Sequence, residues 1–440
     1  MIALIIAITT ALLMISSVLF KPYIKIRGIK IGLYTLVCVV GAIFTLLFGN
    51  VSLVEVGNGL IKDSAINPIK ILILFISMTL MSVYLGDSGF FNFIADKVLI
   101  KSKGGLLKLF LSLYFVVAFL TIFTSNDIVI LTFTPPICIF AKKLKISPIP
   151  FLFGEFVAAN TWSMALIIGN PTNVYLASAG NITFIQYLSV MIVPTIIGGL
   201  VSLGVLLLLF RKTFFPKSTT KLQPSTIELN ATSGYVRLNK VVMSVCLIHL
   251  CICIIFLTIS SYIGIEMWLI CLVLAVSLTI FLIAYGFIKE NSLVRVVCGL
   301  KKAPYELIFF VISMFIIVLG LNKNGWTNAL SNLLISGKNI DGVSLGFVSA
   351  VSSNFLNNIP MSILFESIVN GKNLASVYGA IIGSNIGAYI TPVGALAGIM
   401  WNNILSNYNV KFSFAKFILY GIIVAIPTLL ATTLTLLLFV

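Results

Sequence analysis

Long apolar runs are the dominant feature of this 440-residue chain, and they require a fold that is embedded in a membrane. Eight of these runs cover residues 1–20, 31–49, 69–86, 186–210, 241–261, 267–288, 303–321 and 417–440. Each can cross a hydrocarbon core of about 30 Å as a helix. Only 9% of the residues are charged, whereas soluble domains carry roughly a quarter. The sequence excludes a soluble enzyme and predicts a multi-pass protein of the inner or plasma membrane, with about ten spans.

Four other apolar stretches contain Asn, Pro, Gly and Ser where a plain membrane helix would not. They cover residues 105–140, 150–180, 343–370 and 374–404. Non-helical backbone at membrane depth is tolerated only where protein or a wet cavity surrounds it, because lipid cannot satisfy its amide groups. We therefore expect these stretches to gather inside the protein around a solvated pocket.

Basic residues outnumber acidic residues by 28 to 12, and they cluster in the loops between apolar runs. The positive-inside bias explains such clusters, so we expect no nucleic acid as a partner. Clusters at 97–108 and 142–145 flank the first broken stretch, and both are cytoplasmic only if 105–140 enters and leaves on one side. The same reasoning makes 343–370 a hairpin that opens from outside. The prediction is two re-entrant hairpins, with both chain termini outside.

The two halves of the chain match in sequence. A shift of 236 residues aligns Pro68 with Pro304, Ile76–Met78 with Ile312–Met314, Leu85 with Leu321, Gly89 with Gly325 and Asn92 with Asn328. Because the first half starts inside and the second outside, we expect repeats of inverted topology, as in alternating-access transporters. Chance similarity between apolar helices is the alternative.

The predicted fold class is an all-α polytopic membrane protein in two inverted repeats. A leading transmembrane helix and basic loop cover 1–29, and a cytoplasmic linker with a connecting helix covers 211–265. The first repeat covers 30–210, with hairpin 105–140 and broken helix 150–180; the second covers 266–440, with hairpin 343–370 and broken helix 374–404.

Polar clusters at the hairpin turns and helix breaks form the candidate binding site. Half-helix N-termini offer N–H groups to an anion or neutral oxyacid, and C-termini offer carbonyls to a cation. The predicted substrate-binding residues are Ser125, Asn126, Asn170, Thr172, Asn173, Asn354, Asn357, Asn358, Thr391 and Gly394. The breaks themselves are assigned to Gly169, Pro171, Pro360 and Pro392. Interhelical hydrogen bonding is the alternative role for the amides.

Acidic residues at membrane depth are the candidate coupling groups, because an unpaired buried charge is costly. Asp127 lies at the first hairpin turn, where capping the next half-helix is its alternative role. Glu155 is the second coupling candidate, with structural pairing to a lysine as the alternative. The seven cysteines lack metal-ligand spacing and are interpreted as packing residues, so neither a metal nor a cofactor is predicted.

These motifs resemble the ion-transporter superfamily, which contains arsenical pump membrane proteins, sodium/proton antiporters and citrate or dicarboxylate carriers. The arsenite permease type is the most similar, through Asn126-Asp127 with Thr134-Pro135, the turn Asn357-Asn358-Ile359-Pro360, and the segment 383–401. One position departs from that pattern, since Asn385 stands where the family usually has Asp. The missing acidic residue affects which ion, H+ or Na+, can be coupled to transport.

The resemblance and the broken helices together predict a secondary transporter that exports arsenite or antimonite by an elevator or rocking mechanism driven by the proton gradient. A sodium- or proton-coupled anion carrier and a Na+/H+ antiporter are alternatives. A further alternative is the membrane subunit of an ATP-driven pump, because the chain has no Walker phosphate loop of its own. The expected partners are a small anion or neutral oxyacid, H+ or Na+, and lipid. A homodimer and an ATPase partner are left open.

Overall fold

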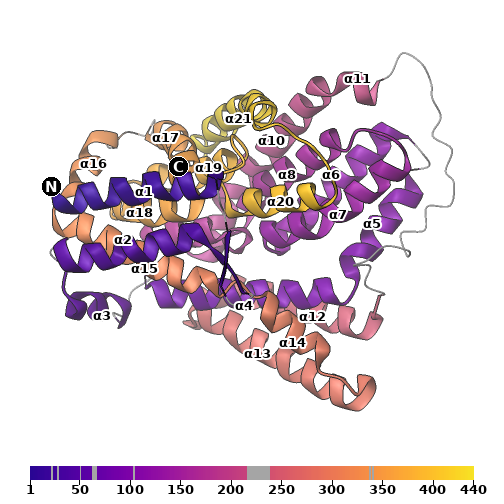
Figure 1. Ribbon diagram of the computed structural model, residues 1–440, viewed down its shortest axis with the longest axis horizontal. Helices are drawn as coiled ribbons and strands as arrows, with labels where there is room; N and C mark the ends of the chain where they lie inside the picture. The colour runs from indigo at the N-terminus through magenta and orange to yellow at the C-terminus, as the bar shows by residue number, and fades with distance from the viewer. Residues whose placement is uncertain are drawn as a thin grey trace.

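The computed structural model describes residues 1–440 except 21–22, 27–28, 50, 62–66, 103–104, 216–237, 336–337 and 339–340. The described chain is almost entirely helical, as predicted (Figure 1). One short antiparallel hairpin of β1 (Tyr23–Ile26) and β2 (Ile29–Gly32) accompanies the helices, in a segment where β-branched isoleucine recurs at every second position. Most of the predicted cytoplasmic linker lies outside the described residues, as do Lys103 and, in the first basic loop, Lys21 and Arg27.

All eight uninterrupted apolar runs form helices. They are α1 (Ile2–Phe20), α2 (Leu33–Phe48), α4 (Pro68–Asp87), α10 (Phe184–Leu209), α12 (Lys240–Ile263), α13 (Met267–Tyr285), α15 (Glu306–Lys323) and α21 (Phe414–Leu436). In the described part of the chain, seven helical segments are long and apolar enough to cross a membrane, among them α4, α10, α12 and α21. Both α1 and α2 are shorter apolar helices. The protein is therefore a polytopic helical membrane protein.

The four broken stretches are interrupted where the sequence predicts. The first hairpin is α6 (Leu106–Phe123) with α7 (Asn126–Lys143), and the second is α17 (Asp341–Leu356) with α18 (Asn358–Val369). The first broken helix is α8 (Ile149–Trp162), two 3-10 turns and α9 (Pro171–Ala179); the second is α19 (Leu374–Gly387) with α20 (Leu396–Asn407). Their re-entrant course through the membrane stays a prediction. The remaining short helices are α3 (Leu53–Ile61), α5 (Phe90–Lys101), α11 (Arg211–Phe214), α14 (Val294–Lys302) and α16 (Trp326–Leu334).

The second half of the chain repeats the element order of the first, with α12 to α21 following the sequence of α1 to α10. The halves also exchange contacts. Helix α2 packs on α15 while its counterpart α13 packs on α4, and α7 packs on α20 while α18 packs on α9. Left-handed glycines begin the equivalent helices α5 and α16, with φ 85° at Gly89 and 77° at Gly325. Exchanged packing is what a two-fold relation between the halves produces, and it includes α1 and α12, which lie outside the predicted repeats.

Glycines allow the second hairpin to approach the second broken helix closely. A Cβ atom at Gly383 of α19 would lie 2.1 Å from the carbonyl oxygen of Gly346 of α17. Such a clash would push the two backbones apart, so small residues are required along this contact. The contact holds α17 beside α19, and thereby places the turn after α17 at the break after α19 (Figure 1).

Candidate transport site

The turn of the first hairpin is fixed to the first broken helix. Asn126, at the start of α7, donates from Nδ2 to Oδ1 of Asn160 at 3.0 Å. Asn160 in turn donates to the carbonyl oxygen of Phe156 at 2.8 Å, which orients its amide. Asn160 was not among the predicted site residues. The two asparagines place the hairpin turn directly before the helix break.

Asn385 of α19 joins the two halves of the protein inside the first break. Its Oδ1 accepts from Ser163 Oγ and from Asn170 Nδ2, both at 3.0 Å. Its Nδ2 donates to Asn173 Oδ1 at 2.7 Å, and the side chain is fully buried. Ser384 also donates to the hydroxyl of Thr172 at 3.1 Å. These bonds use the polar groups of Asn170, Thr172 and Asn173 to connect the repeats.

The first break is built by the residues that the sequence assigns to it. Gly169 ends the second 3-10 turn, and Pro171 begins α9. Asn170 caps α9, because its side chain accepts from the backbone N–H of Thr172 at 3.2 Å. The partners Ser163, Ser384 and Asn385 were not predicted as site residues, and for Asn385 the signal was its departure from the family's Asp.

The turn of the second hairpin docks on the second break. The backbone N–H of Asn358 donates to the carbonyl oxygen of Gly394, and Asn357 Nδ2 donates to that of Val393, both at 3.0 Å. Asn354 Nδ2 donates to the carbonyl oxygen of Gly387 at 2.9 Å. Asn357 has φ 70° and ψ 152°, a conformation that a residue with a side chain rarely adopts. Docking therefore holds this turn in a strained shape.

The other predicted residues of the second half lie around the same contact. Pro360 is in the first turn of α18, and Pro392 is in the break between α19 and α20. Thr391 accepts from the backbone N–H of Val393 at 3.3 Å. A Cβ atom at Gly394 would lie 2.9 Å from Asn354 Oδ1, so a side chain there would crowd that amide. The structure thus brings these predicted residues of the second half to one junction.

Some of the buried polar atoms that have no hydrogen-bond partner lie at the two hairpin turns. Among the residues that the structure describes, they include Ser125 Oγ, Asn126 Oδ1, Asn354 Oδ1 and Asn358 Oδ1. Leaving a buried polar atom unpaired costs about 1–3 kcal/mol. Three of these atoms are amide oxygens, which accept hydrogen bonds or bind cations but cannot donate. The turns therefore offer acceptors to a ligand that brings O–H groups or positive charge.

A cavity of about 420 Å³ leads to the first hairpin turn. It lies between α4 and α7, with Ser125 and Asp127 at the turn and Met400 of α20 also in its wall. Pro135 and Pro136 interrupt the helical hydrogen bonds of α7 beside it. At the ends of α4 and α14, Asp87 and Lys302 line the same cavity and form an ion pair.

The two predicted coupling carboxyls have different surroundings. Asp127 lines the cavity, whereas Glu155 is 2% exposed and enclosed between α7 and α8. Glu155 accepts from Thr134 Oγ1 at 3.1 and 3.2 Å, so its partner is a hydroxyl rather than a lysine. A third acid, Glu366 of α18, is also buried and contacts Ser367.

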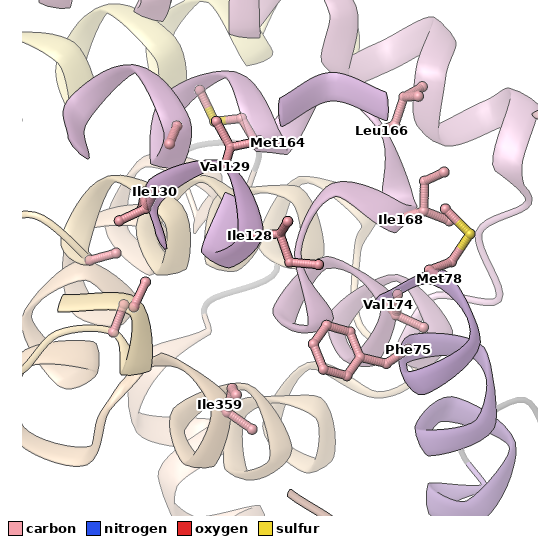
Figure 2. Close-up of a cluster of buried hydrophobic side chains, with 14 of the residues drawn as sticks. Phe75, Met78, Ile128, Val129, Ile130, Met164, Leu166, Ile168, Val174 and Ile359 are labelled. Carbon is pink, nitrogen blue, oxygen red and sulfur yellow. The ribbon is translucent and has the colours of Figure 1, made fainter. Parts of the chain in front are cut away.

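Apolar side chains surround the first turn and the first break. Figure 2 shows Phe75 and Met78 of α4 gathered in one buried cluster with Ile128 of α7, Leu166 of the break and Ile359 of α18. Hydrogen bonds and ion contacts are stronger in such surroundings than in water, and unpaired polar atoms are more costly. The cluster therefore increases what a ligand gains by pairing with the turns.

Comparison with known proteins matches this geometry to transporters. Residues 12–377 match the model of the CitMHS family, described as citrate transporter. Arsenical pump membrane proteins of Yersinia enterocolitica and Escherichia coli K12 are 27% and 28% identical over 374 and 371 residues, which cover 81% of this chain and 83% of theirs.

The crystal structure of the Alcanivorax borkumensis YdaH transporter has the same fold. It superposes with a TM-score of 0.57 at 13% identity, covering 99% of this chain and 98% of that one. The paired breaks, the docked hairpin turns and the family match over residues 12–377 lead to one conclusion. The chain belongs to the citrate transporter (CitMHS) family and is a membrane transporter, not an enzyme.

Proposed function

We propose that this protein is a secondary transporter that exports an uncharged trivalent oxyacid, arsenite or antimonite, against its gradient in exchange for protons. The observation that carries the proposal is the set of three unpaired amide oxygens on Asn126, Asn354 and Asn358. Arsenite and antimonite are largely neutral at neutral pH, and each presents hydroxyl groups that donate hydrogen bonds. Donors on the cargo match acceptors on the hairpin turns.

We propose that Ser125, Asn126, Asn354 and Asn358 contact the cargo directly. Asn170, Thr172 and Asn173 would then shape the site through their bonds to Asn385 and Ser384. In this assignment Asn357, Thr391 and Gly394 hold the second turn at its break.

The proposed orientation is inverted repeats with both termini outside. Contacts between distant loops support it, because each contact joins loops that the charge pattern assigns to one side. Lys302 pairs with Asp87 on the predicted inner side. Lys70 pairs with Glu266 at 2.6 Å on the predicted outer side. With this orientation the cavity beside Asp127 opens to the cytoplasm, and an elevator or rocking movement would expose the site on the other side.

Asp127 is the proposed proton carrier, because it lines the cavity at the hairpin turn beside two of the unpaired oxygens, Ser125 Oγ and Asn126 Oδ1. A carboxyl in this place can take up a proton when the cargo leaves and lose it when cargo binds. Glu155 is the second proposed coupling group, since a buried carboxyl held by one hydroxyl is costly to keep charged.

A second candidate function is cation-coupled transport of citrate or a dicarboxylate. The same amide oxygens favour it, because they can bind Na+, and a bound cation would then attract a carboxylate. The family description names citrate, while the arsenical pump relatives carry a different name. Sodium dependence separates the two candidates.

The test is flux in proteoliposomes that contain the purified chain alone. Arsenite, antimonite, citrate, succinate and sodium are offered under imposed pH and sodium gradients. The proposal expects arsenite and antimonite accumulation driven by the pH gradient without sodium. Sodium-dependent citrate or succinate uptake would replace it with the second candidate, and flux that needs an added ATPase would assign the chain to an ATP-driven pump.

Asn358→Ala is expected to weaken cargo binding without destabilising the protein. The side-chain oxygen has no hydrogen-bond partner among the described residues, and the alanine keeps the backbone bond to Gly394. Loss of one ligand hydrogen bond should raise KM about tenfold, which corresponds to roughly 1.4 kcal/mol. Asn402→Ala on the exposed face of α20 is the matched control. Unchanged KM, or a loss of thermal stability, would make Asn358 a structural amide.

A further inference from the structure

Asp87 and Lys302 line the cavity where α4 and α14 end, and the exposed side chain of Lys302 places the pair on the solvent side. Asp87 is the last residue of α4 and Lys302 the last residue of α14, and their side chains form a salt bridge. Both line the cavity that also contains Ser125 and Asp127. Because α4 rises about 1.5 Å per residue, Asp87 lies roughly 12 Å along the wall from Thr79, another lining residue. A solute that enters from this end therefore passes the ion pair first.

Asp87 is the fixed member of the pair. Arg295 donates to the carbonyl oxygen of Asp87, and Arg295 is itself held by Glu290 at 2.9 Å. The backbone N–H of Asn239 donates to the next carbonyl, that of Ser88, at 2.8 Å. These contacts satisfy carbonyls at the end of α4 that the helix itself leaves free.

Lys302 is the movable member of the pair. Its side chain is 56% exposed, compared with 15% for that of Asp87. A lysine ammonium on a long flexible stem can leave and return without a backbone movement. The second oxygen of Asp87, Oδ2, is buried and has no hydrogen-bond partner among the described residues. Asp87 therefore holds the lysine through one oxygen, Oδ1.

We propose that Asp87 and Lys302 form a charge-neutral gate at the cavity mouth, which makes the passage favour uncharged solutes over ions of either sign. The inference rests on the proposed function, because it names the charge class of the cargo at the same site. The charged residues that line the cavity are Asp87, Asp127 and Lys302. While the pair is closed, the mouth presents no net charge, so neither cations nor anions are concentrated there.

The other half of the protein has a related ion pair of opposite polarity. Asp87 and Lys323 are related by the repeat shift of 236 residues and end the equivalent helices α4 and α15. Lys323 pairs with Glu55 of α3 at 2.7 Å, as Asp87 pairs with Lys302 of α14. In both cases the long helix of one half is tied to a short helix of the other. The Glu55 and Lys323 pair lies outside the cavity lining and provides a matched control.

The ion pair of Glu55 and Lys323 also stays charged at neutral pH. Hydrogen bonding to Lys323, with further bonds from Ser52, lowers the pKa of Glu55 to about 2. A lowered pKa means that the pairing is present above the ordinary value of 4.5 and is lost only as pH falls through about 2. The control pair is therefore fully charged at neutral pH.

The experiment measures how fast charged reagents reach the cavity. Thr132, which lines the cavity but is not assigned to the cargo site, is replaced in Thr132→Cys. Inside-out vesicles are treated with methanethiosulfonates that carry a trimethylammonium or a sulfonate group. Mass spectrometry of the peptide that contains the introduced thiol gives both modification rates. The readout is the ratio of the cationic rate to the anionic rate, and it does not require transport.

The proposed gate predicts opposite changes of this rate ratio when Lys302 or Asp87 is neutralised. Lys302→Gln leaves an unpaired carboxylate and should raise the ratio by about tenfold, while Asp87→Asn should lower it by a similar factor. The charge-swapped double variant Asp87→Lys with Lys302→Asp should restore the parent ratio, and Lys323→Gln should leave it unchanged. An unchanged ratio in both single variants, or an equal change in Lys323→Gln, would overturn the gate.

A second double variant tests the gate without leaving either charge unpaired. The neutral double variant Asp87→Asn with Lys302→Gln should give the parent ratio with both rates increased, because it has no pair to open. Rates no faster than the parent would also contradict the gate. The two experiments fail in different ways, since citrate transport would contradict the charge class that the gate assigns to the cargo, whereas an unchanged reagent ratio would contradict the role of the ion pair itself.

Discussion

Asp127→Asn should abolish proton-driven accumulation of cargo while downhill exchange continues. Asparagine has nearly the shape of aspartate and keeps an oxygen at the hairpin turn, but it cannot carry a proton. With one proton coupled per cargo molecule, each pH unit supports about tenfold accumulation, since one unit is worth 1.36 kcal/mol. The expected accumulation ratio in the variant is one at every imposed gradient. Paired measurements of net uptake and counterflow in proteoliposomes check it.

Three further variants separate coupling from damage to the site. Asp127→Glu keeps a titratable group and should retain accumulation, although with slower flux because the side chain is longer. Glu155→Gln tests whether the enclosed carboxyl of Glu155 carries the coupled proton. Thr134→Val removes the hydroxyl that donates to Glu155 and keeps the carboxyl. Accumulation that survives in Asp127→Asn and is lost in Glu155→Gln would transfer the coupling role to Glu155. Survival in both variants would exclude both carboxyls.

Asn385→Ala should have the largest effect on stability of any single substitution in the polar network. It leaves the buried groups Asn170 Nδ2 and Asn173 Oδ1 without the partner that Asn385 provides, whereas Ser163 Oγ still donates to the carbonyl oxygen of Asn160 at 2.9 Å. Each unpaired group costs about 1–3 kcal/mol, so roughly 2–6 kcal/mol is expected in total. Thermal unfolding in detergent should show a large fall in the midpoint, with Asn402→Ala on the exposed face of α20 as the control.

Asn385→Asp tests which of these bonds matters most. Its carboxylate can still accept from Ser163 and Asn170, but it cannot donate to Asn173 Oδ1. A double-mutant cycle with Asn173→Ala isolates the 2.7 Å bond between the two halves. Additive effects of the two substitutions would show that this bond does not couple the repeats.

The helices and their breaks are predictable from sequence because both depend on local rules. Lipid requires a membrane-embedded backbone to satisfy its own amide groups, so long apolar runs such as 241–261 must be helical. Pro171 and Pro392 mark breaks because a proline has no N–H to donate. The polar residues at these points could therefore be named as a group before their contacts were known.

The partners of these residues are not predictable from the same rules. Helical periodicity gives the face on which a side chain lies, but not the residue opposite it. The bonds of Asn385 to Asn170 and Asn173 connect positions more than two hundred residues apart in the chain. For the same reason the sequence did not reveal that Asp87 and Lys302 line the same cavity.

If the protein works by the proposed alternating access, the exchanged packing of the halves has a consequence for its second conformation. The backbone of each half already has the conformation that the other half would adopt in the second state. If the first hairpin closed on α4 as the second hairpin now meets α15, and the second withdrew in return, the opening would move toward Glu55 and Lys323. In the outward-facing state the two halves would then have exchanged conformations, each adopting the one that the other has now.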